Sequence, residues 1–349
     1  MLRATGPVIF TLILVTVTAL SWSACNRSAG DPGGLADERA DYPFNSVSRP
    51  ETVLVANVDV SASSFYWFMP YRSADFPEVE TEKRYFALWS TDHDEDDGGI
   101  WWGDFDRLDL SDFREIGLIT SGHQSETPWL IRNPSDPEGE KLYLFFHPDR
   151  SHPDNDEHQQ TRLLTSAGGG KLHLLDWHDR GNVLGLKPED KHTGYLSVHP
   201  NADSSWTGLH LVIGGSPGLY GRSSSEDGRV WKRDSTYWDV DSYMPPGRKL
   251  DPTNITFFTR DSVRYAVALN KSRDAHGLTY EDQFVGLAIA DEDYRVYDYM
   301  GLIWEDEPAS DVRAFVADGR VHFYLAGPNT RLRYAAAPLK SQASIAQQL

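Results

Sequence analysis

Five short apolar runs recur at a nearly fixed spacing, and this recurrence limits most strongly how the chain can fold. Successive runs begin 57, 67, 56 and 57 residues apart. They are Tyr85–Trp89, Leu142–Phe146, Leu209–Ile213, Tyr265–Leu269 and His322–Ala326. Apolar runs of this length, rich in aromatic and branched side chains, are typical of buried strands.

Each run has strand-like neighbours on both sides. In the second unit these are Pro128–Ile131 before the run, then Gln160–Leu164 and Leu172–Trp177 after it. Four short strands per unit at a regular period indicate a β-propeller, whereas a β-sandwich gives no reason for that period. We therefore predict an all-β fold, a five-bladed β-propeller over residues 51–340, followed by a tail over 341–349.

The last unit contains only three strand-like runs, at 312–316, 321–325 and 332–336. An unassigned run, Val53–Val58, lies before the first unit. We expect this N-terminal strand to complete the last blade and close the ring.

Composition excludes several classes of function. The chain has 349 residues and a formal net charge of −19, which repels nucleic acids and anionic membrane faces. Its single cysteine excludes an internal disulfide framework and a multi-thiolate zinc site. We expect a monomer that binds no nucleic acid.

The N-terminus has the features of an export signal. An apolar run, Val8–Val15, follows Arg3, and small residues lead to Cys25. Ser23-Ala24-Cys25 resembles a bacterial lipobox, in which the cysteine is lipidated and becomes the first mature residue; ordinary signal-peptide cleavage nearby is the alternative. We predict a signal peptide over 1–24, a membrane anchor at Cys25, a tether over 25–50, and a location in the cell envelope, or secretion. By resemblance to lipoprotein sorting, Asn26 favours the outer membrane.

Two segments that lead into the second and third units carry candidate catalytic side chains. The first, Gly122–Trp129, contains His123, and the following run ends at His147; the second, His192–His199, contains Tyr195, and Arg222 follows it. This order of His, His, Tyr and Arg resembles the β-propeller ulvan lyases of polysaccharide lyase families 24 and 25. The resemblance covers chiefly residues 117–235.

The resemblance implies β-elimination of an acidic, uronate-containing polysaccharide without a cofactor. Such a lyase removes the C5 proton of a uronate and expels the C4 oxygen, so it needs a cation against the carboxylate and a group that transfers the proton. The implied catalytic residues are His123, His147, Tyr195 and Arg222. The implied substrate-binding residues are Glu126, His192, Tyr220 and Arg229.

Two other classes of function remain open. Glu126, Asp251 and Asp311 stand where innermost strands are expected to start, and paired carboxylates there would suit a five-bladed glycoside hydrolase. Alternatively, the protein binds glycans without chemistry, through the stacking of Trp67, Trp101 and Trp102.

The remaining motifs point to structure. Ser225–Trp231 resembles the Asp-box turn of sialidases, in which Asp and Gly form a tight turn and Trp packs on the blade. The acidic loop Asp92–Gly99 lacks full EF-hand spacing, and the His/Asp run from His147 to His158 lacks the spacing of metal ligands. We therefore predict no metal site.

Overall fold

The computed structural model describes the greater part of the chain after residue 41. The described residues are 42–53, 65–91, 99–121, 125–147, 159–185, 192–211, 219–234, 238–239, 250–274, 277–305, 309, 311–326 and 332–340. All of them belong to one compact unit, Glu38–Leu349. The predicted signal peptide and Cys25 lie outside them.

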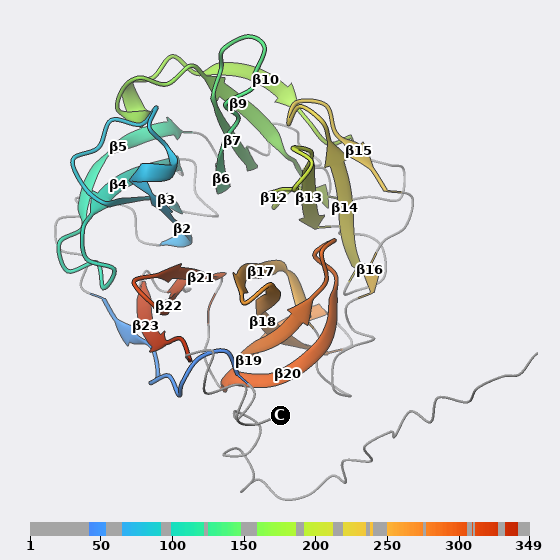
Figure 1. The fold of residues 1–349 in the computed structure, drawn as a ribbon. Helices are drawn as coiled ribbons and strands as arrows, with labels where there is room; N and C mark the ends of the chain where they lie inside the picture. The colour runs from blue at the N-terminus through green and yellow to red at the C-terminus, as the bar shows by residue number, and fades with distance from the viewer. Residues whose placement is uncertain are drawn as a thin grey trace, which may run out of the picture. The chain divides into compact units, whose positions relative to one another are not determined.

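Five antiparallel sheets are arranged radially around one axis and form a five-bladed β-propeller (Figure 1). The predicted fold class is confirmed. Each blade is a meander of at least four strands whose first strand lies at the axis, except that the last blade takes its outermost strand from the N-terminal side of the ring.

The strands are given from the axis outward. The first blade contains β2 (Tyr66–Arg72), β3 (Tyr85–Thr91), β4 (Gly99–Phe105) and β5 (Arg114–Ser121). The second contains β6 (Glu126–Arg132), β7 (Leu142–His147), β9 (Arg162–Ser166) and β10 (His178–Asn182). The third contains β12 (Ser197–Pro200), β13 (Trp206–Leu211) and β14 (Leu219–Ser225), with β15 (Lys232–Arg233) and β16 (Trp238–Asp239) both paired to β14. The fourth contains β17 (Leu250–Arg260), β18 (Val263–Asp274), β19 (Gly277–Ala290) and β20 (Val296–Trp304). The fifth contains β21 (Asp311–Ala317), β22 (Arg320–Ala326), β23 (Arg333–Pro338) and β1 (Glu51–Thr52).

Outside the blades, β8 (Gln159–Gln160) pairs in parallel with β11 (His192–Thr193). Two 3₁₀ turns, η1 (Ser73–Asp75) and η3 (Leu172–Leu174), complete the described elements. The prediction of a strand at Leu172–Trp177 is therefore wrong. Leu172 is buried and its carbonyl accepts a hydrogen bond from Trp177 Nε1, so the apolar residues there fold into a turn, and the outermost strand is β10.

Each of the five apolar runs lies in the second strand of a blade, except that residues 212–213 of the third run lie outside the described residues. Every residue of β3 and of β7 is buried. A strand in this position has a neighbouring blade on each face, so both sets of alternating side chains must be apolar. Five clusters of buried side chains, one at each junction between adjacent blades, form the core of the described residues.

The ring closes as predicted, through an N-terminal strand on the last blade, although the strand starts earlier than expected. Glu51 and Thr52 pair with Tyr334 and Arg333 in β23, and the Val53 N–H donates to the carbonyl of Leu332. Residues 54–58 of the predicted strand lie outside the described residues.

The residues just before β1 also belong to the folded ring. Tyr42 and Phe44 are buried against the fourth and fifth blades. The Tyr42 hydroxyl donates to the carbonyl of Leu302, and Trp304 Nε1 donates to that of Ser48. The predicted tether is therefore wrong for residues 42–50, because two aromatic side chains there have a core to enter.

Candidate active site

The innermost strands β2, β6, β12, β17 and β21 all begin at the same end of the axis. Each complete blade has an even number of antiparallel strands in its meander, so the chain returns to the face from which it started before it enters the next blade. Side chains at the starts of these strands therefore gather at one end of the axis. We call this end the strand-start end.

Two innermost strands begin with a buried carboxyl group. Glu126 is the first residue of β6 and is 1% exposed; Asp311 is the first residue of β21 and is fully buried. Asp251 is the second residue of β17, but its side chain is not among those described. The structure thus places carboxyl groups at the strand starts that the hydrolase interpretation named.

Asp311 is held by its own strand and by the first blade. Arg313 Nε donates to its Oδ2 at 3.0 Å, and Arg313 Nη2 lies 2.9 Å from its Oδ1. The Phe68 N–H on β2 donates to Oδ2 at 3.3 Å. Burial raises the pKa of Asp311 to about 6, although the charge of Arg313 opposes the rise. A carboxyl group with this pKa exchanges its proton close to neutral pH.

The Arg313 guanidinium connects three blades across the axis. It starts from β21 and lies 4.8 Å from the ring centroid of Trp67 on β2 and 5.7 Å from that of Trp129 on β6. Guanidinium groups at such distances from aromatic rings are attracted by the electron-rich ring faces. The Asp311–Arg313 pair is therefore fixed from several sides.

A series of ring contacts continues from Trp67 towards Glu126. The ring of Tyr195, just before β12, lies 5.1 Å from that of Trp67 and 5.1 Å from that of His147. His147 ends β7 directly opposite Glu126 in the strand register. Side chains from four blades thus form one cluster at the strand-start end: Glu126, His147, Tyr195, Trp67, Arg313 and Asp311.

The backbone of this region is strained. Trp67, Thr127 and Tyr195 have positive φ angles of 51°, 53° and 58°. Residues with a Cβ atom avoid this conformation, which costs on the order of 1–3 kcal/mol each, and such residues concentrate at functional sites. All three line one small cavity of about 10 Å³ beside Arg313, and this coincidence marks the strand-start end as the candidate active site.

The structure brings together only part of the residue set expected for a lyase. His147 and Tyr195 are in contact, as described above, whereas His123 lies outside the described residues. Arg222 lies on β14, the third strand from the axis, where it pairs with Asp234 at 3.1 Å and Asp293 at 2.7 Å. Two carboxylates already compensate its charge. His192 and Tyr220 lie in β11 and β14, with side chains that are not described.

Arg229, expected to bind substrate, belongs to the turn that resembles an Asp-box. The Asp227 carboxylate accepts hydrogen bonds from the N–H groups of Arg229 and Val230, and Trp231 packs edge-on against Phe145. The Arg229 side chain forms ion pairs with three acidic residues of the second blade: Asp136, Glu138 and Glu140. This arrangement fastens the third blade to the second.

The tryptophans proposed for glycan stacking are mostly enclosed. Trp102 is fully buried between the first and second blades, and its Nε1 donates to His173 Nδ1 at 3.0 Å. Trp101 packs against the core between the fifth and first blades, and Trp67 is 4% exposed. The prediction that Trp102 stacks on a glycan is therefore wrong, because its ring is fully buried.

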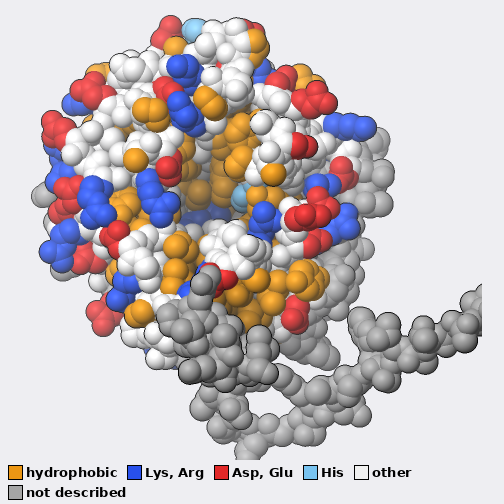
Figure 2. All heavy atoms as spheres, viewed as in Figure 1, with side chains coloured by type: hydrophobic (Ala, Val, Ile, Leu, Met, Phe, Trp, Pro, Cys, Tyr) orange, Lys and Arg blue, Asp and Glu red, His pale blue; other side chains and the backbone are white. Residues whose placement is uncertain are grey.

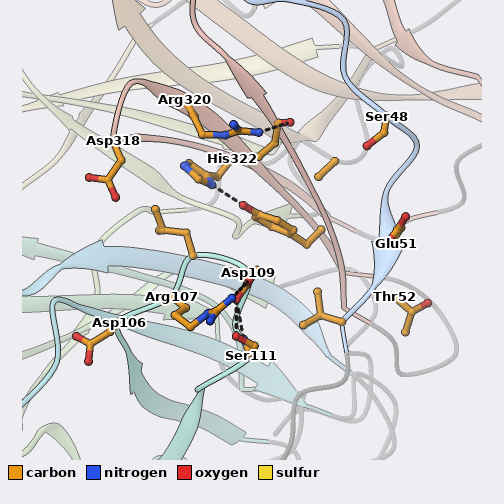
Figure 3. Close-up of a pocket in the computed structure, with 15 residues that line it drawn as sticks. Ser48, Glu51, Thr52, Asp106, Arg107, Asp109, Ser111, Asp318, Arg320 and His322 are labelled. Carbon is orange, nitrogen blue, oxygen red and sulfur yellow. Dashed lines mark hydrogen bonds and ion pairs between the residues drawn. The ribbon is translucent and has the colours of Figure 1, made fainter.

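A polar hollow of about 820 Å³ lies between the fifth and first blades (Figure 3). Some of its polar groups already have partners within the hollow: Arg107 pairs with Asp109, and His322 Nδ1 contacts the Tyr334 hydroxyl at 2.7 Å. Asp318, at its rim, follows the end of β21, so the hollow lies about 20 Å along the axis from Asp311 at the usual rise of a strand. It shares no residue with the strand-start cluster.

Among the described residues, no group of three or more His, Cys, Asp or Glu side chains is placed to hold a metal ion. No helix in the same part of the chain is long and apolar enough to cross a membrane.

No family model matches the chain, and no curated protein matches its sequence. Its fold, however, is similar to those of solved carbohydrate-active enzymes. One is described as a glycoside hydrolase (14% identity, 86% of this chain and 92% of that one, TM-score 0.58). A second is a family 117 glycoside hydrolase from the marine bacterium Zobellia galactanivorans (12% identity, 85% and 92%, TM-score 0.54). A third comes from work on the GH130 family of mannoside phosphorylases, described as containing glycoside hydrolases that target β-1,2-mannosidic linkages in Candida mannan (11% identity, 86% and 96%, TM-score 0.55).

These findings correct the functional prediction. The lyase interpretation is wrong, because the solved structures named above, which share the fold, are described as glycoside hydrolases or as belonging to a family that contains them. The placement of Arg222 agrees with this correction, since the expected carboxylate-neutralising cation pairs with Asp234 and Asp293 away from the innermost strands.

Sequence reasoning missed Arg313 and the aromatic rings around it. A signal was present: Asp311 and Arg313 are two residues apart in an apolar strand, so they share one face of it. Two opposite charges on the same face of a buried strand indicate an ion pair, and because burying charges is costly, such a pair indicates a functional role.

Proposed function

We propose that this protein hydrolyses glycosidic bonds, with its active site at the strand-start end of the propeller axis. The observation that carries the proposal is Asp311, a fully buried carboxyl group at the first position of an innermost strand whose pKa is raised to about 6. The glycoside hydrolases that share the fold support the same class of reaction.

Hydrolysis of a glycosidic bond needs two carboxyl groups with different tasks. One donates a proton to the glycosidic oxygen as the bond to the anomeric carbon breaks. The other, as a carboxylate, either takes a proton from the attacking water or attacks the anomeric carbon itself, and water then supplies the new hydroxyl group. We assign proton donation to Asp311 and the carboxylate role to Glu126.

Arg313 fits the role of a positioning residue for Asp311. Two of its nitrogens contact the two carboxyl oxygens, which fixes the plane of the carboxyl group. Once Asp311 has given up its proton, the guanidinium stabilises the carboxylate that remains. Because the Arg313 guanidinium already pairs with Asp311, it does not bind the carboxylate of a uronate. We therefore propose a glycan substrate whose recognition does not require a uronate carboxylate.

His147 and Tyr195 also belong to the proposed active site. His147 lies opposite Glu126 in the register, and the Tyr195 ring links it to Trp67. Both side chains are suited to shaping the wall beside the second carboxylate. The strained backbone at Tyr195 supports a functional role, since strain of this kind persists only where the surrounding structure enforces it.

The test is a product assay across neutral and uronate-containing glycans. Hydrolysis releases reducing ends with no ultraviolet absorbance, whereas elimination creates an absorbing C4=C5 double bond. We expect reducing ends from the wild type, loss of turnover in Asp311→Asn and Glu126→Gln, and retention in Asp318→Asn, an exposed carboxylate at the opposite end of β21. Glycan binding by the wild type without any product would overturn the proposal in favour of a non-catalytic glycan-binding protein.

A further inference from the structure

A groove of about 710 Å³ lies where the innermost strands of the second and third blades end. Arg132 and Pro200, the last residues of β6 and β12, both line it. Strand β6 spans seven residues and its register shifts between Glu126 and Trp129, so its two ends are at most about 20 Å apart at the usual rise of a strand. The groove therefore opens at the other end of the axis from the Glu126 carboxyl group, although Trp129 lines both this groove and the small cavity beside Arg313. Figure 2 shows one face of the propeller, where apolar side chains line the hollowed centre.

The floor of the groove is aromatic and rigid. Trp129 is partly exposed, donates from Nε1 to the carbonyl of Val198 at 2.9 Å, and meets the His199 ring edge-on. Tyr71 is also partly exposed; its ring stacks on Phe86, and its hydroxyl oxygen accepts the Leu130 N–H. Ring faces that are already fixed bind a flat apolar surface without losing side-chain entropy.

The rim combines rigid turns with polar groups. Three prolines (Pro134, Pro137 and Pro200) and the exposed side chains of Ser135, Ser204 and Glu226 belong to it. One wall is the turn that resembles an Asp-box, held to the second blade because Asn133 Nδ2 donates to the Asp227 carbonyl at 3.1 Å. That turn thus gains a second role as the wall of a groove.

The charge of the groove suits a neutral ligand. Arg132 pairs with Glu78 at 2.7 Å, which cancels the charge of each. Burial lowers the pKa of His199 to about 3, so this ring is neutral at physiological pH. The lining carboxylates of Glu226, which is exposed, and Asp227 then contribute negative charge, and this charge disfavours polyanions.

We propose that this groove is a second binding site, which takes a segment of a neutral oligosaccharide chain. Sugar rings present flat C–H faces that match the aromatic floor, and their hydroxyl groups match the amide, hydroxyl and carboxylate groups of the rim. A volume near 700 Å³ falls within the usual range of ligand pockets. The choice of a sugar as occupant rests on the proposed function, because an enzyme that cleaves a polymer gains effective substrate concentration from a second attachment point.

The experiment uses affinity electrophoresis in gels that contain soluble xylan, mannan, galactan or polygalacturonate. The starting protein is Glu126→Gln, in which turnover is expected to be roughly 10²–10⁴-fold lower, so that the glycan in the gel is not degraded during the run. Two rim substitutions that fill the groove, Glu226→Trp and Ser135→Trp, are added separately. The matched control is Glu292→Trp, an exposed glutamate in the corresponding turn of the fourth blade that does not line the groove.

We expect retardation in at least one neutral gel, and an apparent affinity about tenfold weaker in each rim variant, equal to about 1.4 kcal/mol. The control should retain the affinity of the starting protein, and thermal melting should show all four proteins folded. Equal retardation of rim variants and control overturns the inference, as does retardation by polygalacturonate alone or by no polysaccharide.

Wild-type turnover on the same glycans separates the two proposals. If the wild type turns over the glycan and the rim substitutions do not change retardation, the groove is not a glycan-binding site and the hydrolase proposal stands. If the rim substitutions weaken retardation but the wild type shows no turnover, the hydrolase proposal is refuted and the groove remains a glycan-binding site.

Discussion

Replacing Asp311 with asparagine should abolish activity while it stabilises the fold at neutral pH. Burial raises the pKa of Asp311 from 3.8 to about 6. At 1.36 kcal/mol per pKa unit, the ionised carboxylate costs the folded state about 3 kcal/mol relative to the unfolded chain. Asparagine has the same shape without the charge, so Asp311→Asn should be more stable than the wild type by up to about 3 kcal/mol at pH 7.5.

The pH dependence of this difference has a defined sign. A carboxyl group with a raised folded-state pKa stabilises the protein fully below its unfolded pKa and loses that contribution as pH rises through its folded pKa. The wild type should therefore lose about 3 kcal/mol between pH 4 and pH 7, whereas Asp311→Asn should lack this component. The two proteins should converge near pH 4.

Urea unfolding at several pH values measures this effect, with Asp318→Asn as the control. Asp318 is about half exposed and pairs with Arg84 at the surface, so its replacement should change stability by less than about 0.5 kcal/mol. If Asp311→Asn is instead destabilised at pH 7.5, the carboxylate serves mainly to compensate Arg313, and its assignment as the proton donor is refuted. In the active wild type, kcat/KM should fall as pH rises through about 6.

Three further predictions concern other parts of the chain. Glu126→Gln should lower turnover by roughly 10²–10⁴-fold, as expected when a catalytic carboxylate is removed, and thermal melting should separate this loss from unfolding. Trp231→Ala should lower the free energy of unfolding by about 2–3 kcal/mol, which is less than the loss expected for a fully buried tryptophan. Val230 is 75% exposed in the same turn, so Val230→Ala should have little effect. Equal melting curves for the two variants would refute the structural role of the turn. Cys25→Ser should move the exported protein from the detergent phase to the aqueous phase, and equal partitioning of variant and wild type would contradict lipid anchoring.

The sequence predicted those parts of the fold in which burial constrains residue type. The second strand of each blade is covered on both faces, so runs such as Tyr85–Trp89 are apolar throughout and repeat visibly. Outer strands carry a weaker pattern because one face is more exposed: every residue of β10 is exposed or only partly buried, and its neighbour η3 was mistaken for the strand.

The candidate site was predictable only in its carboxyl groups. Glu126 and Asp311 follow from their positions at strand starts, once the blades are counted. The contacts of Arg313 with Trp67 and Trp129 could not be predicted, since they join residues far apart in the chain across the axis. The positive φ angles of Trp67 and Tyr195 leave no signal in the sequence either, because aromatic residues do not favour that conformation.

The central claim is that Asp311 and Glu126 together hydrolyse a glycosidic bond, and turnover in heavy-oxygen water tests it most directly. Hydrolysis places one heavy oxygen atom at the anomeric carbon of each new reducing end, whereas elimination places none. The account predicts one label per cleaved bond in the wild type, above the exchange seen when finished product is incubated alone, and a rate of label incorporation at least about 100-fold lower in Asp311→Asn and in Glu126→Gln. Unlabelled, unsaturated product, or labelled product formed at the wild-type rate by both variants, would contradict it.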